Sequence, residues 1–216
     1  MGLYQAGDQP GALRSLYDAV ELDPDHFDSE LLMGNIFLLR EDFRRAQEHF
    51  ERATELRPDS HDAKNSLAVL CVHQRRYDEA IRLLRSLTED PLTQEVHLAW
   101  GNLGWAYLEK GDLDQAISAL RHAVQEQPLF CVGHYRLGDA YYRKELWADA
   151  EESLAKAVAT EAPGCVQLQD AHRLLGLARV RLEKREEAAE AFRACQTIDA
   201  ESEDGIECAT YLRGLQ

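Results

Sequence analysis

The chain has 216 residues, of which 45% are hydrophobic, and only 13 are glycine and 6 proline. This composition allows a sizeable core and excludes a loop-rich or disordered protein. The formal net charge of −15 argues against nucleic acid as a partner and against direct binding to an anionic membrane surface, because both depend on clustered Lys and Arg. No run of about 18 apolar residues is present, so no transmembrane helix is expected.

A pattern of about 34 residues recurs along the chain. Each copy is expected to form two antiparallel helices joined by a short turn. We place the copies at about residues 1–26 (partial), 27–60, 61–96, 97–130, 131–168 and 169–201, followed by a polar-faced capping helix at 202–215. One copy cannot bury its apolar face alone, so the copies are expected to stack as a single domain over residues 1–216.

The first copy is incomplete at its start. The residues from Met1 to Asp8 have the pattern of the last turn of a helix, and Gly7 stands where that helix would end. We therefore expect the natural protein to extend upstream, with any targeting segment located there.

The fourth copy, residues 97–130, shows the pattern most clearly. Gly104, Ala116 and Ala123 stand where two helices would approach closely, and Gly111 is expected to end the first helix because glycine tolerates the left-handed conformation. These spacings resemble the tetratricopeptide repeat (TPR). The resemblance implies an all-α fold: a right-handed superhelical solenoid of about six TPR helix pairs plus a C-terminal capping helix.

Five cysteines are distributed so that two pairs can form. Cys131 opens the first helix of the fifth copy, and Cys165 lies in the inserted loop before the sixth. Cys195 stands at a close-contact position, and Cys208 lies on the capping helix facing it. We predict the disulfides Cys131–Cys165 and Cys195–Cys208, with Cys71 as a buried core thiol; five unrelated buried thiols are the alternative. If the pairs form, the protein occupies an oxidising compartment such as the periplasm.

The sequence offers no sign of catalysis. It lacks a glycine-rich phosphate loop, a nucleophile elbow and a zinc-binding helix motif, and no two cysteines have C-x-x-C spacing. His134 and His172 stand at a packing position of their copies, so they are expected to fill space rather than bind metal. We therefore expect a non-enzymatic protein with no cofactor and no metal site.

Partner binding is expected on the first helices of the copies, which line the concave groove of TPR proteins. Groove positions combine aliphatic, amide and aromatic side chains, which suits a partner helix or an extended segment. For Trp105, packing against the neighbouring copy is the alternative. The predicted partner-binding residues are Leu31, Asn35, Leu38, Asn65, Val69, Val72 and Trp105.

Chaperone-binding TPR domains carry a clamp of basic and amide side chains that takes a carboxylate. The equivalent positions of this chain hold Asn65, Val69, Asn102, Val132 and Arg136. Only Asn102 and Arg136 match, and both lysines of the clamp are absent. A chaperone adaptor is therefore not expected.

The segment from Asp90 to Tyr107 (DPLTQEVHLAWGNLGWAY), with Phe130-Cys131 after it, is less generic than the repeat pattern. On these residues the chain resembles the TPR lipoproteins of type IV pilus biogenesis, the Tgl-like pilotins of the PilF/PilW family. The resemblance implies a pilotin that binds the outer-membrane secretin subunit and promotes its outer-membrane localisation and multimer assembly. It also implies an N-terminal lipid that anchors the full-length protein at the periplasmic face of the outer membrane, although the signal and the lipidated cysteine are absent from this chain.

In this interpretation the early copies hold a secretin segment, and the protein is expected to be a monomer. The alternative is a generic TPR scaffold or adaptor for another multiprotein complex.

Overall fold

The computed structural model describes residues 9–162, 164–165 and 167–215. These residues form twelve α-helices, and no strand occurs among them. The helical turn expected over Met1 to Asp8 lies outside the described part of the chain.

The helices fall into two compact units, Met1–Gln94 and Glu95–Gln216. The boundary lies in the connection between the third and fourth copies. The N-terminal unit contains α2 (Gln9–Leu22), α3 (Phe27–Leu39), α4 (Phe43–Leu56), α5 (His61–His73) and α6 (Tyr77–Thr88). The C-terminal unit contains α7 (Val96–Lys110), α8 (Leu113–Glu126), α9 (Cys131–Arg143), α10 (Trp147–Ala159), α11 (Gln169–Arg181), α12 (Arg185–Ile198) and α13 (Glu203–Gly214).

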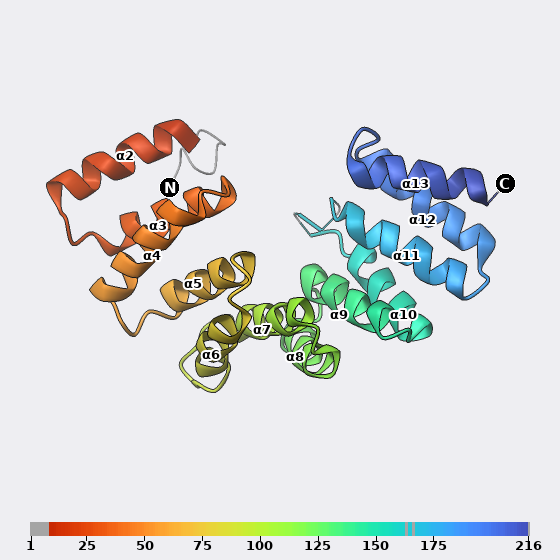
Figure 1. Ribbon diagram of the computed structural model, residues 1–216, viewed down its shortest axis with the longest axis horizontal. Helices are drawn as coiled ribbons and strands as arrows, with labels where there is room; N and C mark the ends of the chain where they lie inside the picture. The colour runs from red at the N-terminus through yellow and green to blue at the C-terminus, as the bar shows by residue number, and fades with distance from the viewer. Residues whose placement is uncertain (1–8, 163, 166, 216) are drawn as a thin grey trace. The chain divides into compact units, whose positions relative to one another are not determined.

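Within each unit, successive helices pack as antiparallel pairs, as Figure 1 shows. The predicted fold class is confirmed: the chain is all-α, it is built from TPR-like helix pairs, and α13 caps its C-terminal end. The expectation that all copies form one continuous domain stays a prediction.

The turn inside each helix pair requires one residue in the left-handed conformation. Gly111 has φ +88° and ends α7, as predicted. In the other pairs the same place is taken by Glu41, Arg75, Glu145 and Glu183, with φ between 57° and 61°. Side chains rarely adopt this conformation, and it costs about 1–2 kcal/mol for a residue with a Cβ. Packing of the two helices therefore fixes the turn even where the local sequence disfavours it.

Small residues allow the two helices of a pair to approach each other. A Cβ added at Gly104 of α7 would overlap Leu120 of α8, and one at Gly138 of α9 would overlap Leu154 of α10. Ala116 and Ala123 on α8 are fully buried. The close-contact positions predicted from the repeat pattern are thus the positions at which the helices pack.

Each unit has its own apolar core. In the N-terminal unit, Met33, Ile36, Phe37 and Phe50 are at most 2% exposed. In the C-terminal unit the core passes from α7 through α12 and includes Leu120, which is fully buried. Full burial of a side chain of this size contributes about 1.5–3 kcal/mol, so these residues account for much of the stabilisation.

The cysteines pair as predicted. Cys131 of α9 is bonded to Cys165 in the loop before α11, with a Cα–Cα distance of 5.8 Å. Cys195 of α12 is bonded to Cys208 of α13, with a Cα–Cα distance of 6.4 Å. Cys71 is a free thiol buried in α5, and burial raises its pKa to about 11. The second disulfide therefore fastens the capping helix to the last TPR helix.

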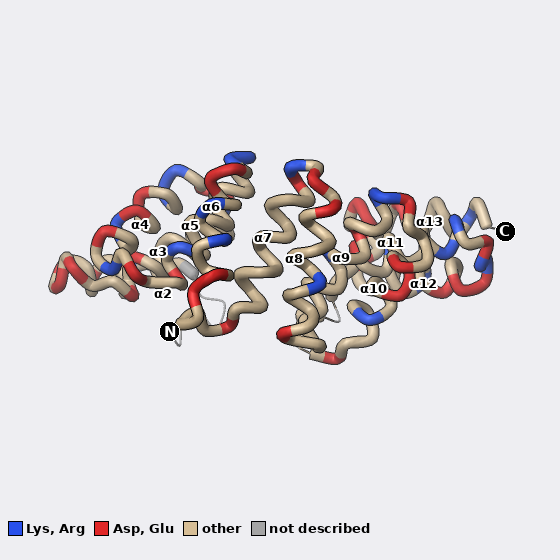
Figure 2. Tube along the Cα trace, turned by 90° about the horizontal axis from the view of Figure 1, so that it is seen from below, with Lys and Arg blue, Asp and Glu red and all other residues tan. Residues whose placement is uncertain are grey.

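Charged side chains are distributed along the helices of both units, with acidic positions the more numerous (Figure 2). Many form ion pairs one turn apart on one helix, such as Arg44–Glu48 and Lys156–Glu152. None of the described helices is long and apolar enough to cross a membrane.

Candidate partner-binding groove

In the N-terminal unit the predicted residues of α3 form a partly exposed row. Leu31, Asn35 and Leu38 are half-buried, and each stands three or four residues from the next, so that they share one face of the helix. The aliphatic members also pack against the core of this unit. Their exposed sides can contact a partner, while their buried sides hold α3 in place.

The neighbouring α5 contributes Asn65 and Val69, which are also half-buried. Ser66 of α5 donates a hydrogen bond of 3.3 Å from Oγ to the side-chain oxygen of Asn35, which joins the two helices. Val72 is only 3% exposed and offers almost no surface. The structure thus brings together five of the six predicted residues of this unit as an accessible row, and Val72 is covered.

Trp105 belongs to the C-terminal unit, where it has a cationic neighbour. The guanidinium carbon of Arg136 lies 4.5 Å from the centre of the Trp105 ring. Arg136 Nη1 also donates hydrogen bonds to Asn102 Oδ1, at 3.1 Å, and to the carbonyl oxygen of Gly101, at 3.3 Å. These contacts join α9 to α7 and fix one face of the Trp105 ring, which remains half-buried.

Burial lowers the pKa of Arg136 to about 10, against the opposing influence of Tyr135 and Glu109. The guanidinium therefore keeps its charge at neutral pH. Burial raises the pKa of Tyr135, which stays a neutral phenol. This part of the groove holds a cation against the Trp105 ring.

The same helix carries a second arginine that is matched by carboxylates. Arg143 Nη2 lies 2.8 Å from Asp139 Oδ2 and 3.5 Å from Glu109 Oε1. Tyr142, a groove position in the sequence, packs edge-on against Trp147 of α10 at 4.9 Å between ring centres. Tyr142 is therefore held by its own helix pair.

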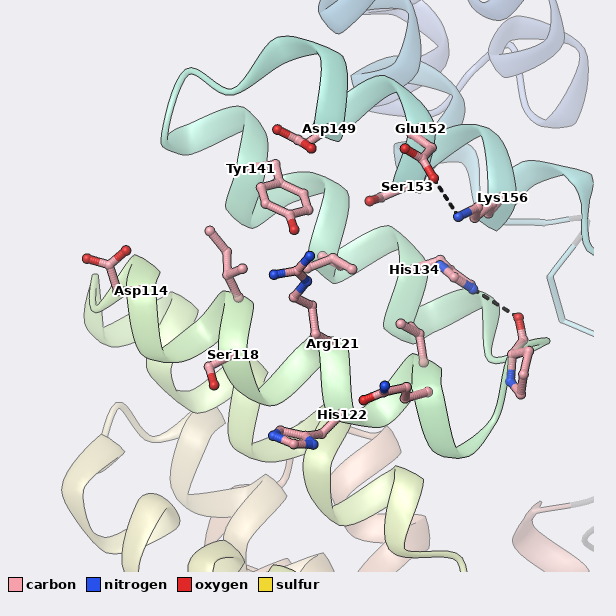
Figure 3. Close-up of a pocket in the computed structure, with 15 residues that line it drawn as sticks. Asp114, Ser118, Arg121, His122, His134, Tyr141, Asp149, Glu152, Ser153 and Lys156 are labelled. Carbon is pink, nitrogen blue, oxygen red and sulfur yellow. Dashed lines mark hydrogen bonds and ion pairs between the residues drawn. The ribbon is translucent and has the colours of Figure 1, made fainter.

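In the sequence, Arg136 and Asn102 are two matches to a carboxylate clamp, and nothing there predicted the contact of Arg136 with Trp105. Their positions in the repeat could have signalled it, because residues at equivalent heights of adjacent first helices face each other. A second feature, a hollow between α8, α9 and α10 (Figure 3), had no signal in the sequence, since its residues come from three helices.

His134 is held as a packing residue. His134 is 6% exposed and its Nε2 donates a hydrogen bond of 2.9 Å to the carbonyl oxygen of Pro128. Burial lowers the pKa of His134, so its ring is neutral at pH 7. The expectation that His134 fills space is confirmed. Among the described residues, no group of three or more His, Cys, Asp or Glu side chains is placed to hold a metal ion.

The tetratricopeptide repeat family profile matches residues 31–93, 74–129 and 135–203. Together these matches cover most of the chain. Among curated proteins, the chain is 29% identical over 111 residues to the type IV pilus assembly protein PilF of Pseudomonas aeruginosa, covering 50% of this chain and 43% of PilF. It is 24% identical over 216 residues to the BBSome complex member BBS4 of Bos taurus, covering 85% of this chain and 41% of that protein. The chain spans less than half the length of these curated relatives.

Solved structures share the fold over nearly the whole chain. The crystal structure of PilW, described as a widely conserved type IV pilus biogenesis factor, matches with a TM-score of 0.83 at 22% identity, covering 97% of this chain and 94% of PilW. The structure of Pseudomonas aeruginosa PilF matches with a TM-score of 0.77 at 19% identity, covering 97% and 93%. At these identities the likeness concerns the fold.

Proposed function

This chain belongs to the tetratricopeptide repeat family, whose members generally act as non-enzymatic scaffolds, and we propose that it has the role of a pilotin in type IV pilus biogenesis. In this proposal it binds the secretin subunit, helps it to reach the outer membrane and promotes its assembly into a multimer. A lipid at the N-terminus of the full-length protein anchors it at the periplasmic face of that membrane.

The observation that carries the proposal is the sequence match to PilF, a type IV pilus assembly protein. The match in fold with PilW along nearly the full length of both chains agrees with it. The two disulfides also agree, because disulfides persist in oxidising compartments such as the periplasm and are rare in the cytosol.

We place the secretin-binding site on the row formed by α3 and α5. Leu31, Leu38 and Val69 supply aliphatic contact, while Asn35 and Asn65 supply amide groups for backbone or side-chain hydrogen bonds. A surface of this kind suits a segment with one apolar side, either an amphipathic helix or an extended strand. Trp105, in the other unit, is proposed as a further contact.

The experiment is retention of the secretin's periplasmic part by the immobilised protein and by its Leu38→Asp and Val69→Asp variants. An unpaired carboxylate buried against an apolar partner costs at least about 1.4 kcal/mol, so each variant should bind at least about tenfold more weakly. Leu39→Asp is the matched control, because Leu39 is the next residue of α3 and is 62% exposed. Helix content measured by circular dichroism shows that each variant folds.

Three outcomes separate the possibilities. Loss of secretin binding in both site variants, with binding retained by the Leu39→Asp control, supports the row on α3 and α5 as the site. Full binding by both site variants refutes the location but not the partner. No binding by the unmodified chain refutes the pilotin proposal and favours a scaffold for another complex, for which the match to BBS4, named as a complex member, is the supporting observation.

A further inference from the structure

Between α8, α9 and α10 lies a hollow of about 860 Å³ that the proposed function does not use (Figure 3). The second helices α8 and α10 form its walls, and side chains of α9 form its floor. The groove row of α3 and α5 belongs to the other unit, so this hollow is a separate surface.

The hollow has an apolar part, formed by Leu137 on its floor and by Ile117 and Val124 on the α8 wall. Leu137 of α9 is 5% exposed, and Ile117 and Val124 of α8 are partly buried against the same core cluster. An aliphatic side chain placed on this floor would lose contact with water without requiring any rearrangement, and burial of apolar area is favourable at about 25 cal/mol per Å².

Three hydrogen-bond donors line the middle of the hollow. Figure 3 shows the Arg121 guanidinium and the Tyr141 hydroxyl pointing toward each other, with the Ser153 hydroxyl on the facing wall. Within the described part of the chain, none of the three side chains makes a hydrogen bond or an ion pair. The Ser153 side chain is nevertheless 7% exposed, whereas the hydroxyls of Thr54 on α4 and of Thr160 at the end of α10 each donate to a carbonyl four residues earlier. Donors held in this way are available to an acceptor that enters the hollow.

The acidic side chains around the hollow are largely neutralised. Asp114 pairs with Lys144, and Glu152 pairs with Lys156 at 2.7 Å. Asp149 lies on the other side of the Tyr141 ring from Arg121 (Figure 3). Arg121 and Asp149 are thus the two lining charges without an ion pair among the described residues, and Arg121 is the cation available to an entering carboxylate.

We propose that this hollow is a docking site for a partner protein segment that carries a carboxylate next to an aliphatic side chain. The carboxylate accepts from the guanidinium of Arg121 and from the hydroxyls of Tyr141 and Ser153, and the aliphatic neighbour lies on Leu137. Arginine binds a carboxylate through two parallel hydrogen bonds, which gives such a site both affinity and orientation. A small inorganic anion would leave the apolar floor and most of the hollow unfilled, so a peptide segment is the occupant that fits.

The test uses the full chain labelled with ¹⁵N and a short blocked peptide, acetyl-Ala-Leu-Glu-Leu-Ala-amide, together with its counterpart in which Gln replaces Glu. Titration is followed by the backbone amide shifts. The Glu peptide should shift amides of α8, α9 and α10. The Gln peptide should bind at least about tenfold more weakly, because hydrogen bonds to an ionised carboxylate are stronger than those to a neutral amide.

Arg121→Gln should weaken binding of the Glu peptide by a similar factor, and Tyr141→Phe and Ser153→Ala should each weaken that binding less. The matched control is Arg193→Gln, which removes the same charge from an exposed position on α12. Equal affinity for the two peptides refutes the proposal, and so does an Arg121→Gln variant that binds the Glu peptide as tightly as the unmodified chain. Amide shifts confined to other helices, or full displacement of the Glu peptide by inorganic phosphate, also refute it. The outcome is independent of secretin binding, because neither the peptides nor these variants involve α3 or α5.

Discussion

Removal of the Cys195–Cys208 disulfide should release the capping helix without unfolding the rest of the C-terminal unit. Besides the disulfide, α13 is held by a salt bridge of 2.6 Å between Arg173 Nε and Asp204 Oδ1, and by a hydrogen bond of 2.8 Å from Ser202 Oγ to Gln169 Oε1. Both contacts lie near the start of α13. The later turns of the helix are held by the disulfide, by the stacking of Tyr211 on Phe192 and by a hydrogen bond of 2.7 Å from Arg185 Nε to the carbonyl oxygen of Leu215.

The stabilisation that each disulfide provides follows from the length of the chain segment it closes. Cys195 and Cys208 are 13 residues apart, and Cys131 and Cys165 are 34 residues apart. In the chain-entropy treatment these lengths correspond to about 3 and about 4 kcal/mol. Loss of about 3 kcal/mol should raise the rate at which α13 opens and exchanges its amide hydrogens by about a hundredfold.

The assay is native-state hydrogen exchange on the double variant Cys195→Ser with Cys208→Ser. Amides in the later turns of α13 should exchange about a hundredfold faster than in the unmodified chain, whereas amides of α9 and α10 should keep their protection. Reduction of the unmodified chain should reproduce the effect at α13, and reduction of the double variant should add nothing there. Protection of α13 that is unchanged in the double variant would refute the reasoning, as would a uniform loss across the unit.

Three further predictions concern single positions. Gly111→Ala should lower the free energy of unfolding in urea by at least about 1 kcal/mol, because Gly111 has φ +88°. For Glu151, burial would raise the pKa, but hydrogen bonds from Lys184 and Arg179 outweigh it and lower the pKa. Glu151→Gln should therefore cost stability at pH 7, by up to about 1 kcal/mol, and that cost should disappear as pH falls through the lowered pKa of Glu151. Cys71, whose pKa burial raises to about 11, should resist iodoacetamide at pH 8 and react only after unfolding.

Each of these has its own control. Glu145→Gly places glycine at the same turn position of the next helix pair, where φ is 61°, and should stabilise the chain rather than destabilise it. A pH-independent cost of Glu151→Gln would show that shape and not charge is responsible. Rapid labelling of Cys71 in the folded chain would contradict its burial, and labelling of more than one thiol without reductant would contradict the disulfides.

The periodicity of the sequence determined most of the fold. Small residues such as Gly104 and Ala116 must recur at fixed spacing for two helices to approach, so the spacing alone located the helix pairs. The Cys195–Cys208 disulfide followed from the same spacing, because these residues occupy facing positions of successive helices. The left-handed residues Glu41 and Glu145 could be located only by analogy with Gly111, since their local sequence does not favour that conformation.

The tertiary structure decided the details of the binding surfaces. Val72 has the repeat position of a groove residue, yet its neighbours cover it. The cation on Trp105 depends on how the Arg136 side chain crosses from α9 to α7. The hollow around Arg121 combines side chains from three helices, and no spacing along the chain encodes the direction in which they point. Helix placement follows from periodicity in one dimension, whereas a binding surface depends on side-chain conformations that only packing in three dimensions selects.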